Sequence, residues 1–404
     1  MRPSVRSRPA ALLALLCLLS GCSDAAAAAS PRTQAGTSPA APATTSPSAS
    51  PPAPVEQQVD AALAGMDRRA EVAQLFVVGV TLDDLSPGDD LVDGGVGGVF
   101  LAGRSRDPAP ALADVTSRWA DAAPGPRPWV AADQEGGQVQ ALQGPGFDRL
   151  PAADEQGQLA PDRLATLAGT LGAQLASAGV TLDLAPVADV VPAGTEAAND
   201  PIGAFGRQYG GTAADVVPDV RAVVDGLAAH GVTATLKHFP GLGLVDANTD
   251  EVAGVTDPVT TAVSEQVTAF GELARSDADP FVMVSSATYP RLDPAAPATF
   301  SRRVITTLLR GFLRFDGVVV TDDVGAAATF ADVPPGERAV RFLEAGGTLV
   351  LTLDADVYPE MVDAVLARAE ADPGFSATVD AAVRTALTAK ARSSLLGGDP
   401  RVVR

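Results

Sequence analysis

Eight short apolar runs recur along the chain, and the spacing between them leaves room for a helix after each run. They cover residues 74–80, 97–101, 129–132, 181–185, 233–236, 281–284, 318–321 and 348–352. The runs are apolar without strict alternation of apolar and polar positions, which is typical of parallel strands covered on both faces. We therefore predict eight parallel strands in one α/β domain.

The segments between these runs have the periodicity of helices. They are rich in Ala, Leu and Val and carry charges at helical spacing, most clearly over residues 163–178 and 219–230. Gly179 and Gly231 directly follow these two segments, where glycine is typical of a helix end. Eight alternating strand and helix units favour a single (β/α)₈ TIM-type barrel. A doubly wound open sheet is the alternative.

Polar and charged residues follow four of the predicted strands at the point where each strand ends. They occupy positions 133–137 after the third strand, 237–241 after the fifth, 285–286 after the sixth and 322–323 after the seventh. The carboxyl ends of barrel strands converge on one rim, and barrel enzymes have their active sites there. We therefore expect these side chains to form one site.

The N-terminal region has the pattern of an export signal. Three arginines precede an apolar run over residues 11–19, which is too short to span a bilayer as a mature helix. The segment Leu19-Ser20-Gly21-Cys22 resembles the lipobox of bacterial lipoproteins, which implies cleavage before Cys22 and lipidation of that residue. We expect residues 1–21 to be a lipoprotein signal peptide and the protein to be exported and anchored on the extracytoplasmic face of the cell membrane. An ordinary signal peptide with an incidental cysteine is the alternative.

The segment after Cys22 differs in composition from the rest of the chain. Residues 23–54 are almost wholly Ala, Ser, Thr and Pro, with little apolar bulk to bury. We expect a lipidated Cys22 and a disordered tether over residues 22–58, followed by a folded barrel domain over residues 59–404.

Cysteine usage and charge narrow the chemistry of the predicted domain. The two cysteines of the chain, Cys17 and Cys22, both precede the domain, which excludes disulfides, a cysteine nucleophile and a thiolate metal site within it. Residues 59–404 contain 25 basic and 47 acidic residues, a net charge of −22. Such an acidic domain argues against nucleic acid and anionic lipid as ligands. Membrane attachment would therefore come from the lipid on Cys22. Separately, we expect the protein to be a monomer.

Four segments together resemble the N-terminal domain of glycoside hydrolase family 3. They read Asp-Gln-Glu-Gly-Gly-Gln-Val-Gln at 133–140, Leu-Ala-Pro-Val-Ala-Asp-Val at 184–190, Lys-His-Phe-Pro-Gly at 237–241 and Phe-Asp-Gly-Val-Val-Val-Thr-Asp-Asp at 315–323. The resemblance covers about residues 66–391, and the sequence has no second domain, which indicates the β-N-acetylhexosaminidase branch. It implies a retaining hydrolase that releases terminal β-linked N-acetylglucosamine from peptidoglycan-derived or chitin-like fragments, with no metal or organic cofactor.

The resemblance also implies roles for individual residues. Asp322 is the nucleophile that attacks the anomeric carbon, while Asp323 is the second choice. The expected ligands of the sugar hydroxyls are Asp133, Arg207, Lys237 and His238. A surface salt bridge is the alternative for Arg207, and helix capping is the alternative for the two aspartates. We expect Glu135 to support its loop and Asp189 to orient its neighbours.

One loop departs from the pattern of the hexosaminidase branch. That branch continues Lys-His-Phe-Pro-Gly-His-Gly and then has an Asp-Ser-His loop whose Asp and His serve as acid/base. The corresponding positions here are Asn248 and Asp250, and the chain has only two histidines, His230 and His238. His230 ends a predicted helix, and neither histidine has the partners of a metal centre.

Another acid must then protonate the leaving oxygen. Asp250 is our first candidate, followed by Asp246 or Glu251, provided that burial raises the pKa of the carboxyl toward neutrality. Retention also requires the acid to lie about 5–5.5 Å from the nucleophile. Ser286 replaces a further histidine of the family.

Three alternatives remain open at this point. The chain could be a non-catalytic glycan-binding lipoprotein, because the loop histidine is missing, or a β-glucosidase-like enzyme. Transfer of the sugar to phosphate or to another sugar is a variant of the hydrolase.

Overall fold

The computed structural model describes residues 53–396, and these form one barrel. Its eight parallel strands follow the order β11-β8-β7-β6-β3-β2-β1-β12. The strands are β1 (Phe76–Thr81), β2 (Gly98–Ala102), β3 (Trp129–Ala132), β6 (Leu182–Asp183), β7 (Thr233–Phe239), β8 (Phe281–Val284), β11 (Val319–Thr321) and β12 (Val350–Thr352). Each of the eight predicted runs overlaps one of them, and the predicted (β/α)₈ barrel is confirmed.

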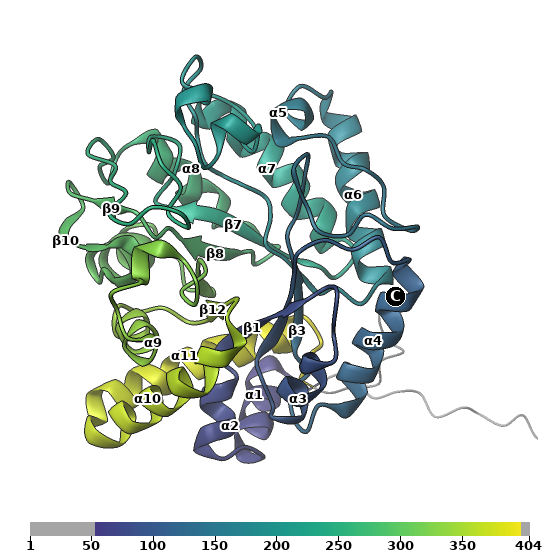
Figure 1. Cartoon of the computed structure of the whole chain (residues 1–404), viewed down its shortest axis with the longest axis vertical. Coiled ribbons are helices and arrows are strands. Elements are labelled where there is room, and N and C mark those ends of the chain that lie inside the picture. Colours follow the sequence, from purple (N-terminus) through teal and green to yellow (C-terminus); the bar gives the residue numbers. More distant parts are fainter. Residues whose placement is uncertain (1–52, 397–404) are drawn as a thin grey trace, which may run out of the picture. The chain divides into compact units, whose positions relative to one another are not determined.

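The first and last strands close the circle. Val77 of β1 is in register with Leu351 of β12 on one side and with Gly98 of β2 on the other. A bridge between Val320 and Leu349 joins β11 to the start of β12, and the Thr321 N–H donates to the Leu349 carbonyl at 3.0 Å. Figure 1 shows the strands at the centre with the helices arranged around them.

Eleven α-helices occur in the described part of the chain. They are α1 (Val55–Ala64), α2 (Arg68–Ala73), α3 (Pro87–Asp93), α4 (Ala109–Ala122), α5 (Ala153–Gln156), α6 (Pro161–Ser177), α7 (Ala213–Ala228), α8 (Glu265–Leu273), α9 (Pro335–Glu344), α10 (Tyr358–Ala371) and α11 (Pro373–Arg392). A π-helix, η4, covers Arg303–Phe312, and short 3₁₀ turns are η1 (Glu196–Ala198), η2 (Gly203–Phe205), η3 (Ala298–Phe300), η5 (Ala328–Phe330) and η6 (Ala355–Val357). Two small hairpins pair β4 (Gln134–Gly136) with β5 (Val139–Gln140) and β9 (Thr288–Tyr289) with β10 (Asp293–Pro297).

The two clearest predicted helices are both present. Helix α6 matches the prediction within two residues at its start, whereas α7 begins six residues before the predicted start. The Thr212 hydroxyl caps α7 by accepting from the Asp215 N–H, and Pro218 lies inside the helix near this end. Gly179 and Gly231 both have a φ of +74°, the left-handed conformation that favours glycine after a helix.

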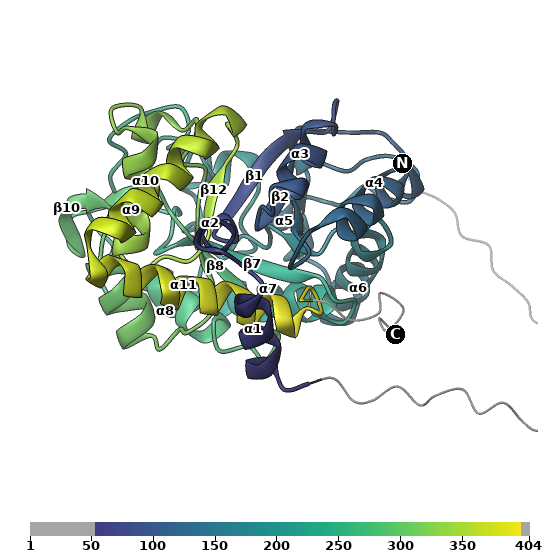
Figure 2. The ribbon, with the colours of Figure 1, turned by 90° about the horizontal axis from the view of Figure 1, so that it is seen from below.

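The folded part begins earlier than expected. Helix α1 starts at Val55, although residues 55–58 were assigned to the tether. The reason is that Val59 of this helix is buried and α1 packs against α11, as Figure 2 shows. The predicted signal peptide, Cys22 and most of the tether lie outside the described residues. Between residues 53 and 396, no helix combines the length and the apolar character that a membrane crossing requires.

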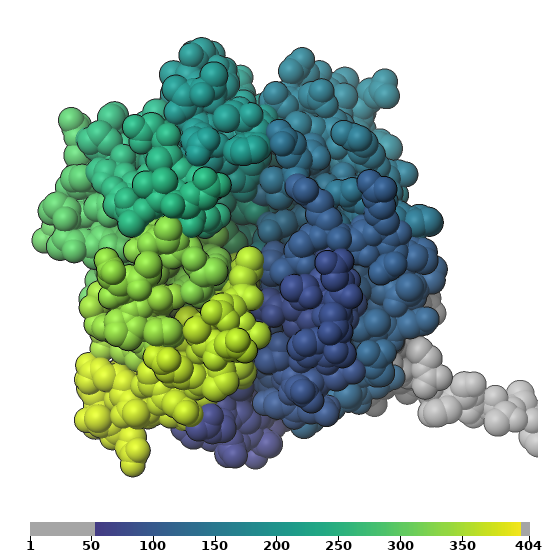
Figure 3. Space-filling model, viewed as in Figure 1, coloured from purple at the N-terminus to yellow at the C-terminus, as the bar shows by residue number. Residues whose placement is uncertain are grey.

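Four connections at the carboxyl ends of the strands carry residues of interest. They are the segment 133–152 after β3 with the β4–β5 hairpin, the segment 184–212 between β6 and α7, the segment 240–264 between β7 and α8, and the segment 322–334 between β11 and α9. In Figure 3, the N-terminal part of the barrel (blue) and the C-terminal part (green to yellow) meet along a groove near the centre of the view. The barrel thus brings residues that are nearly 200 positions apart in the sequence to one rim.

Candidate active site

A pocket of about 140 Å³ opens at the carboxyl ends of the strands. All six residues that the sequence predicted for the site line it: Asp133, Arg207, Lys237, His238, Asp250 and Asp322. Asp246 and Glu251, the other candidates for the acid, are exposed and are not among the lining residues. The predicted convergence of strand ends on one pocket is therefore observed.

One side of the pocket, which we call the polar wall, consists of Asp133, Glu135, Arg207, Lys237, His238, Asp250 and Asp322. Lys237 and Glu135 form its buried base. The Lys237 ammonium lies 2.6 Å from Glu135 Oε1 and donates to Asp133 Oδ1 at 2.7 Å. Burial alone would lower the pKa of Lys237, but the Asp133 and Glu135 carboxylates outweigh it and raise that pKa. Lys237 is therefore a permanent cation and a hydrogen-bond donor in the pocket.

Arg207 is fixed by the same carboxylate. Its Nε and Nη2 donate to Glu135 Oε2 and Oε1, both at 2.8 Å, and Nη1 donates to the Pro201 carbonyl at 2.7 Å. This bidentate pair is largely buried, so the alternative of a surface salt bridge is wrong. Burial of Glu135 opposes its ionisation, but Arg207 and Lys237 together lower the pKa of Glu135 to about 2. Glu135 thus orients two cations, which is more than the loop support expected of it.

His238 is oriented by Asp189, as the sequence suggested. Asp189 is fully buried, and its Oδ2 lies 2.7 Å from His238 Nδ1. Its Oδ1 accepts from the backbone N–H groups of His238 and Leu242, at 3.1 and 2.8 Å. An ionised carboxylate can only accept, so Nδ1 carries the proton and Nε2 is the other ring nitrogen that His238 offers to the pocket.

The two aspartates after β11 have different surroundings. Asp323 accepts from three backbone N–H groups, those of Gly325, Ala326 and Leu353, at 2.8–2.9 Å. Asp322 Oδ1 accepts from the Asp323 N–H at 2.9 Å, and within residues 53–396 its Oδ2 makes no hydrogen bond to protein. Asp323 therefore holds the turn at residues 325–326 and the backbone after β12, and neither aspartate caps a helix; the Asp322 carboxylate lines the pocket.

Asp250 completes the polar wall at the mouth of the pocket. The pKa of Asp250 is raised to about 7, mainly by the neighbouring Asp322 carboxylate and secondly by burial. Asp323 adds to the rise, whereas His238 and Arg207 oppose it. The Asp250 side chain keeps contact with solvent, so we attribute the shift mainly to its negative neighbour. The Asp250 carboxyl is thus about half protonated near neutral pH.

Two features, one next to the pocket and one in its lining, escaped the sequence analysis. Asp183, inside β6, is fully buried, and its Oδ1 accepts from the Gln134 N–H at 3.1 Å, next to Asp133. Burial raises the pKa of Asp183 to about 8, so its carboxyl is neutral at pH 7. A charged residue within an apolar strand was the available signal. The second feature is an apolar wall of Phe100, Leu351 and Leu353, which have no distinctive pattern in the sequence.

The two remaining polar residues of interest lie elsewhere. Ser286 is buried and does not line the pocket, and its hydroxyl lacks a hydrogen-bond partner within the described chain. His230 is exposed just after α7. Across residues 53–396, no group of three His, Cys, Asp or Glu side chains is arranged to hold a metal ion.

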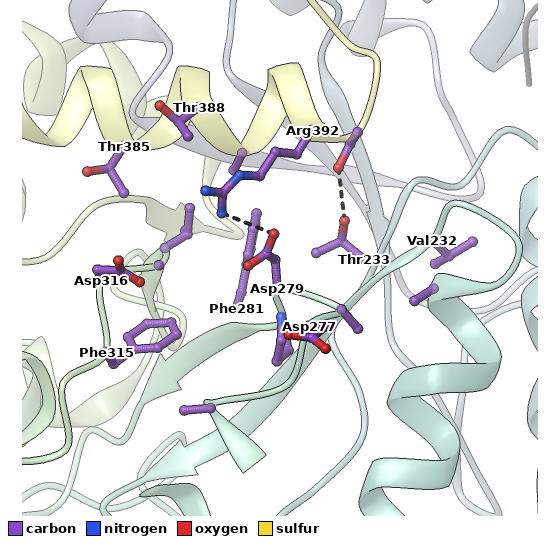
Figure 4. Close-up of a pocket in the computed structure, with 18 of the residues that line it drawn as sticks. Val232, Thr233, Asp277, Asp279, Phe281, Phe315, Asp316, Thr385, Thr388 and Arg392 are labelled. Atoms are coloured by element: carbon purple, nitrogen blue, oxygen red, sulfur yellow. Dashed lines mark hydrogen bonds and ion pairs between the residues drawn. The ribbon is translucent and has the colours of Figure 1, made fainter. Parts of the chain in front are cut away.

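A larger cavity, of about 490 Å³, lies at the opposite end of the barrel. The starts of β7, β8 and β11 and the last turns of α11 form its walls, and Figure 4 shows Arg392 reaching Asp279, with 3.0 Å between the charged atoms. None of the predicted site residues lines it. The amino-terminal end of a barrel is its structural end, which fits this difference.

Comparisons with known proteins agree with the geometry. Residues 68–389 match the Glycosyl hydrolase family 3 N terminal domain. A β-hexosaminidase of Xanthomonas campestris pv. campestris (strain B100) is 33% identical over 306 residues, which are 73% of this chain and 88% of that protein. A β-hexosaminidase of Bordetella avium (strain 197N) is 34% identical over 288 residues, which are 69% of this chain and 78% of that protein.

Solved structures give the same result. The β-N-acetylhexosaminidase from Beutenbergia cavernae DSM 12333 has a TM-score of 0.77 and 47% identity, covering 80% of this chain and 98% of that one. A family 3 β-N-acetylglucosaminidase from Paenibacillus sp. str. FPU-7 has a TM-score of 0.75 and 28% identity, covering 82% of this chain and 64% of that one. With the family match spanning most of the chain, the protein belongs to glycoside hydrolase family 3, in the branch of the β-hexosaminidases.

Proposed function

We propose that this protein is a retaining β-N-acetylhexosaminidase that removes terminal N-acetylglucosamine from peptidoglycan-derived or chitin-like fragments. The observation that carries the proposal is the pairing of Asp322 and Asp250 in one small pocket with four sugar-binding groups. The names of the relatives support the hexosaminidase activity. A pocket of this size suits one sugar ring, which supports release of a terminal residue.

In the first step, an Asp322 oxygen attacks the anomeric carbon and forms a covalent ester. The bond from that carbon to the leaving oxygen breaks, and the Asp250 carboxyl gives its proton to the departing oxygen. The raised pKa of Asp250 supports this role, because about half of the carboxyl is protonated near pH 7 and more at lower pH. Ionised Asp322 supplies the electron pair for the new bond.

In the second step, water attacks the same carbon from the face that the leaving group vacated. Asp250, now ionised, takes a proton from the water, while the ester bond to Asp322 breaks and restores its carboxylate. Two inversions give net retention of configuration. The loss of negative charge on Asp322 in the ester lowers the pKa of Asp250, which suits its change from acid to base.

Binding of the sugar falls to the polar wall. Asp133 and His238 Nε2 accept hydrogen bonds from sugar hydroxyls, whereas Lys237 and Arg207 donate to them. Glu135 and Asp189 keep these side chains in place through the contacts of 2.6–2.8 Å described above. Fixed partners of this kind reduce the entropy lost when the ring is positioned for attack.

The test is a comparison of substrates and variants. We expect the purified protein to hydrolyse 4-nitrophenyl N-acetyl-β-glucosaminide faster than the β-glucoside and to lose that activity in Asp322→Ala. Proton NMR of the early product should show the β-anomer first. Initial release of the α-anomer would exclude retention, and binding of N-acetylglucosamine without turnover would select the non-catalytic alternative. Faster hydrolysis of the glucoside would select the β-glucosidase alternative, and a sugar phosphate formed in phosphate buffer would identify transfer.

Localisation is a separate proposal that rests on the sequence. We infer that lipid on Cys22 anchors the protein outside the cell membrane, on the evidence of the signal pattern and lipobox-like segment. Expression of the full chain in a bacterium fed an alkyne-tagged fatty acid should label the wild type and leave Cys22→Ala unlabelled. Equal labelling of both would remove the basis for the anchor.

A further inference from the structure

Two of the active-site loops are joined by hydrogen bonds directly behind the carboxyl pair. The Ala328 N–H donates to the Asp250 carbonyl at 3.0 Å, and the Thr329 N–H donates to the Thr249 carbonyl at 3.4 Å. The Thr329 hydroxyl also donates to the Thr249 carbonyl, at 2.9 Å, and lies 3.4 Å from the Val252 carbonyl. We call these contacts the loop clasp. They link the segment that carries Asp250 to the segment that follows Asp322.

The Asp322 side of the clasp is firmly fixed. Near the start of the segment 322–334, Asp323 accepts from the Gly325 and Ala326 N–H groups and from the Leu353 N–H after β12. The Arg338 guanidinium donates to the Val324 and Gly325 carbonyls near its start and to the Val333 carbonyl near its end, at 2.6–2.7 Å. Between these points, Phe330 is fully buried against Phe300. The segment therefore offers a rigid support at Thr329.

The Asp250 side has few supports of its own. Residues 250–254 are five successive exposed residues, and the next buried side chain along the chain is that of Val255. Within the turn, the Asn248 side chain accepts from the Asp250 N–H at 3.1 Å, and the Asn248 carbonyl accepts from the Glu251 and Val252 N–H groups at 3.2 and 2.9 Å. Thr249 is buried and provides the carbonyl that the Thr329 hydroxyl binds. The local bonds shape the turn itself, whereas the clasp joins it to the segment that follows Asp322.

We propose that Thr329 is a positioning residue, whose hydroxyl keeps the Asp250 turn against the segment after Asp322 and so keeps the acid next to the nucleophile. The inference rests on the proposed function, because it assigns a task to a residue that does not touch the substrate. The rigid segment after β11 then positions both carboxyl groups: Asp322 directly, and Asp250 through Thr329. The distance between the acid and the nucleophile is thereby kept constant, although they come from different loops.

The charges around Asp250 make its position measurable. Asp322 and Asp323 face it from the end of β11, His238 faces it from β7, and Arg207 faces it from the segment before α7. The two aspartates raise the pKa of Asp250, whereas His238 and Arg207 lower it. If the turn moves away from Asp322, the largest raising influence weakens, and the Asp250 pKa falls toward the usual range of a carboxyl.

The experiment compares Thr329→Val, which keeps the size and the backbone contacts, with Thr329→Ser, which keeps the hydroxyl. The kcat/KM of each variant is measured across pH on 4-nitrophenyl N-acetyl-β-glucosaminide and on diacetylchitobiose. We expect Thr329→Val to lose about three- to tenfold on the disaccharide, the worth of one hydrogen bond, and less than about twofold on the aryl substrate, which needs little acid help. The alkaline limb of the kcat/KM profile of Thr329→Val should move to lower pH. Thr329→Ser should have the disaccharide activity and the pH profile of the wild type.

Thr166→Val is the matched control, because the Thr166 hydroxyl bonds only within the exposed face of α6. If Thr329→Val does not fold, Thr329→Ala takes its place. Equal losses on both substrates with an unchanged alkaline limb would mean a purely structural role and overturn the inference. A wild type without activity on either substrate would overturn the proposed function, and the inference with it.

Discussion

Lys390 places a charge where the fold cannot easily accommodate one, which gives a prediction with a definite sign. Its side chain lies on α11 and is fully buried, and its Nζ donates to Gln74 Oε1 at 2.7 Å. Among the described residues, no carboxylate forms an ion pair with it. Burial lowers the pKa of Lys390 to about 7, from about 10.4 in an unfolded chain.

The pH dependence follows from these two pKa values. Between pH 7 and about 10.4 the unfolded chain binds more protons at this residue than the folded chain, so the free energy of unfolding rises with pH through this window. At pH 7 the buried lysine destabilises the fold by about 4 kcal/mol, and at pH 10.4 by less than about 0.5 kcal/mol. Below pH 7 Lys390 is protonated in both the folded and the unfolded state, so the destabilisation has its largest value and no longer changes with pH.

The perturbation is Lys390→Met, which keeps the length of the stem and removes the charge. It also removes the hydrogen bond to Gln74, which costs about 1–3 kcal/mol at any pH. We therefore expect the variant to be about 1–3 kcal/mol more stable than the wild type at pH 7, and about 0.5–3 kcal/mol less stable at pH 10.4. The difference should change sign between these values.

Urea unfolding of both proteins at several pH values between 6 and 10.5 measures this difference. Arg384→Met is the control, because Arg384 lies on the same helix, is exposed and keeps its charge throughout the window. Its effect should be small and independent of pH. A difference between Lys390→Met and wild type that stays constant across the window would refute the reasoning.

Two further predictions concern the active site. Asp250→Asn should lower kcat/KM on diacetylchitobiose by a factor of about 10²–10⁴ and affect the aryl substrate far less. Equal losses on both substrates would show that Asp250 is not the acid. The wild-type kcat/KM should fall as pH rises through about 7, where Asp250 loses its proton. Glu135→Gln should destabilise the protein by about 3–5 kcal/mol in thermal unfolding and weaken N-acetylglucosamine binding, because Lys237 and Arg207 lose a buried carboxylate. Glu337→Gln, which breaks an exposed pair with Arg341, should cost less than about 1 kcal/mol.

The sequence predicted the barrel because its strands are buried on both faces, so each of the eight runs is apolar as a block. It also predicted the site, because polar residues directly after a strand can only lie at the carboxyl end of a barrel. Asp133, Lys237 and Asp322 were identified in this way, and the structure brings them to one pocket.

Other features depended on contacts between distant segments. Residues 55–58 look like tether, and only the packing of α1 on α11 shows that they belong to the fold. The pairing of Glu135 with both Lys237 and Arg207 joins three separate segments. Thr329 lies among alanines in a stretch without a recognisable motif. Its hydroxyl has a bonding partner only because the loop after β7 brings the Thr249 carbonyl next to it. Local patterns do not report such pairings.

The arrangement around Glu135 bears on which sugars the pocket can accept. Lys237 and Arg207 face Asp133 and Glu135, so two cations and two anions balance in the proposed sugar site. Beyond them, Asp322 and Asp323 add negative charge. An acidic substituent on the bound ring would therefore meet no unpaired cation and would be repelled by the aspartates. Uncharged rings should bind with little dependence on ionic strength, and a ring with a free amine should bind better in dilute buffer.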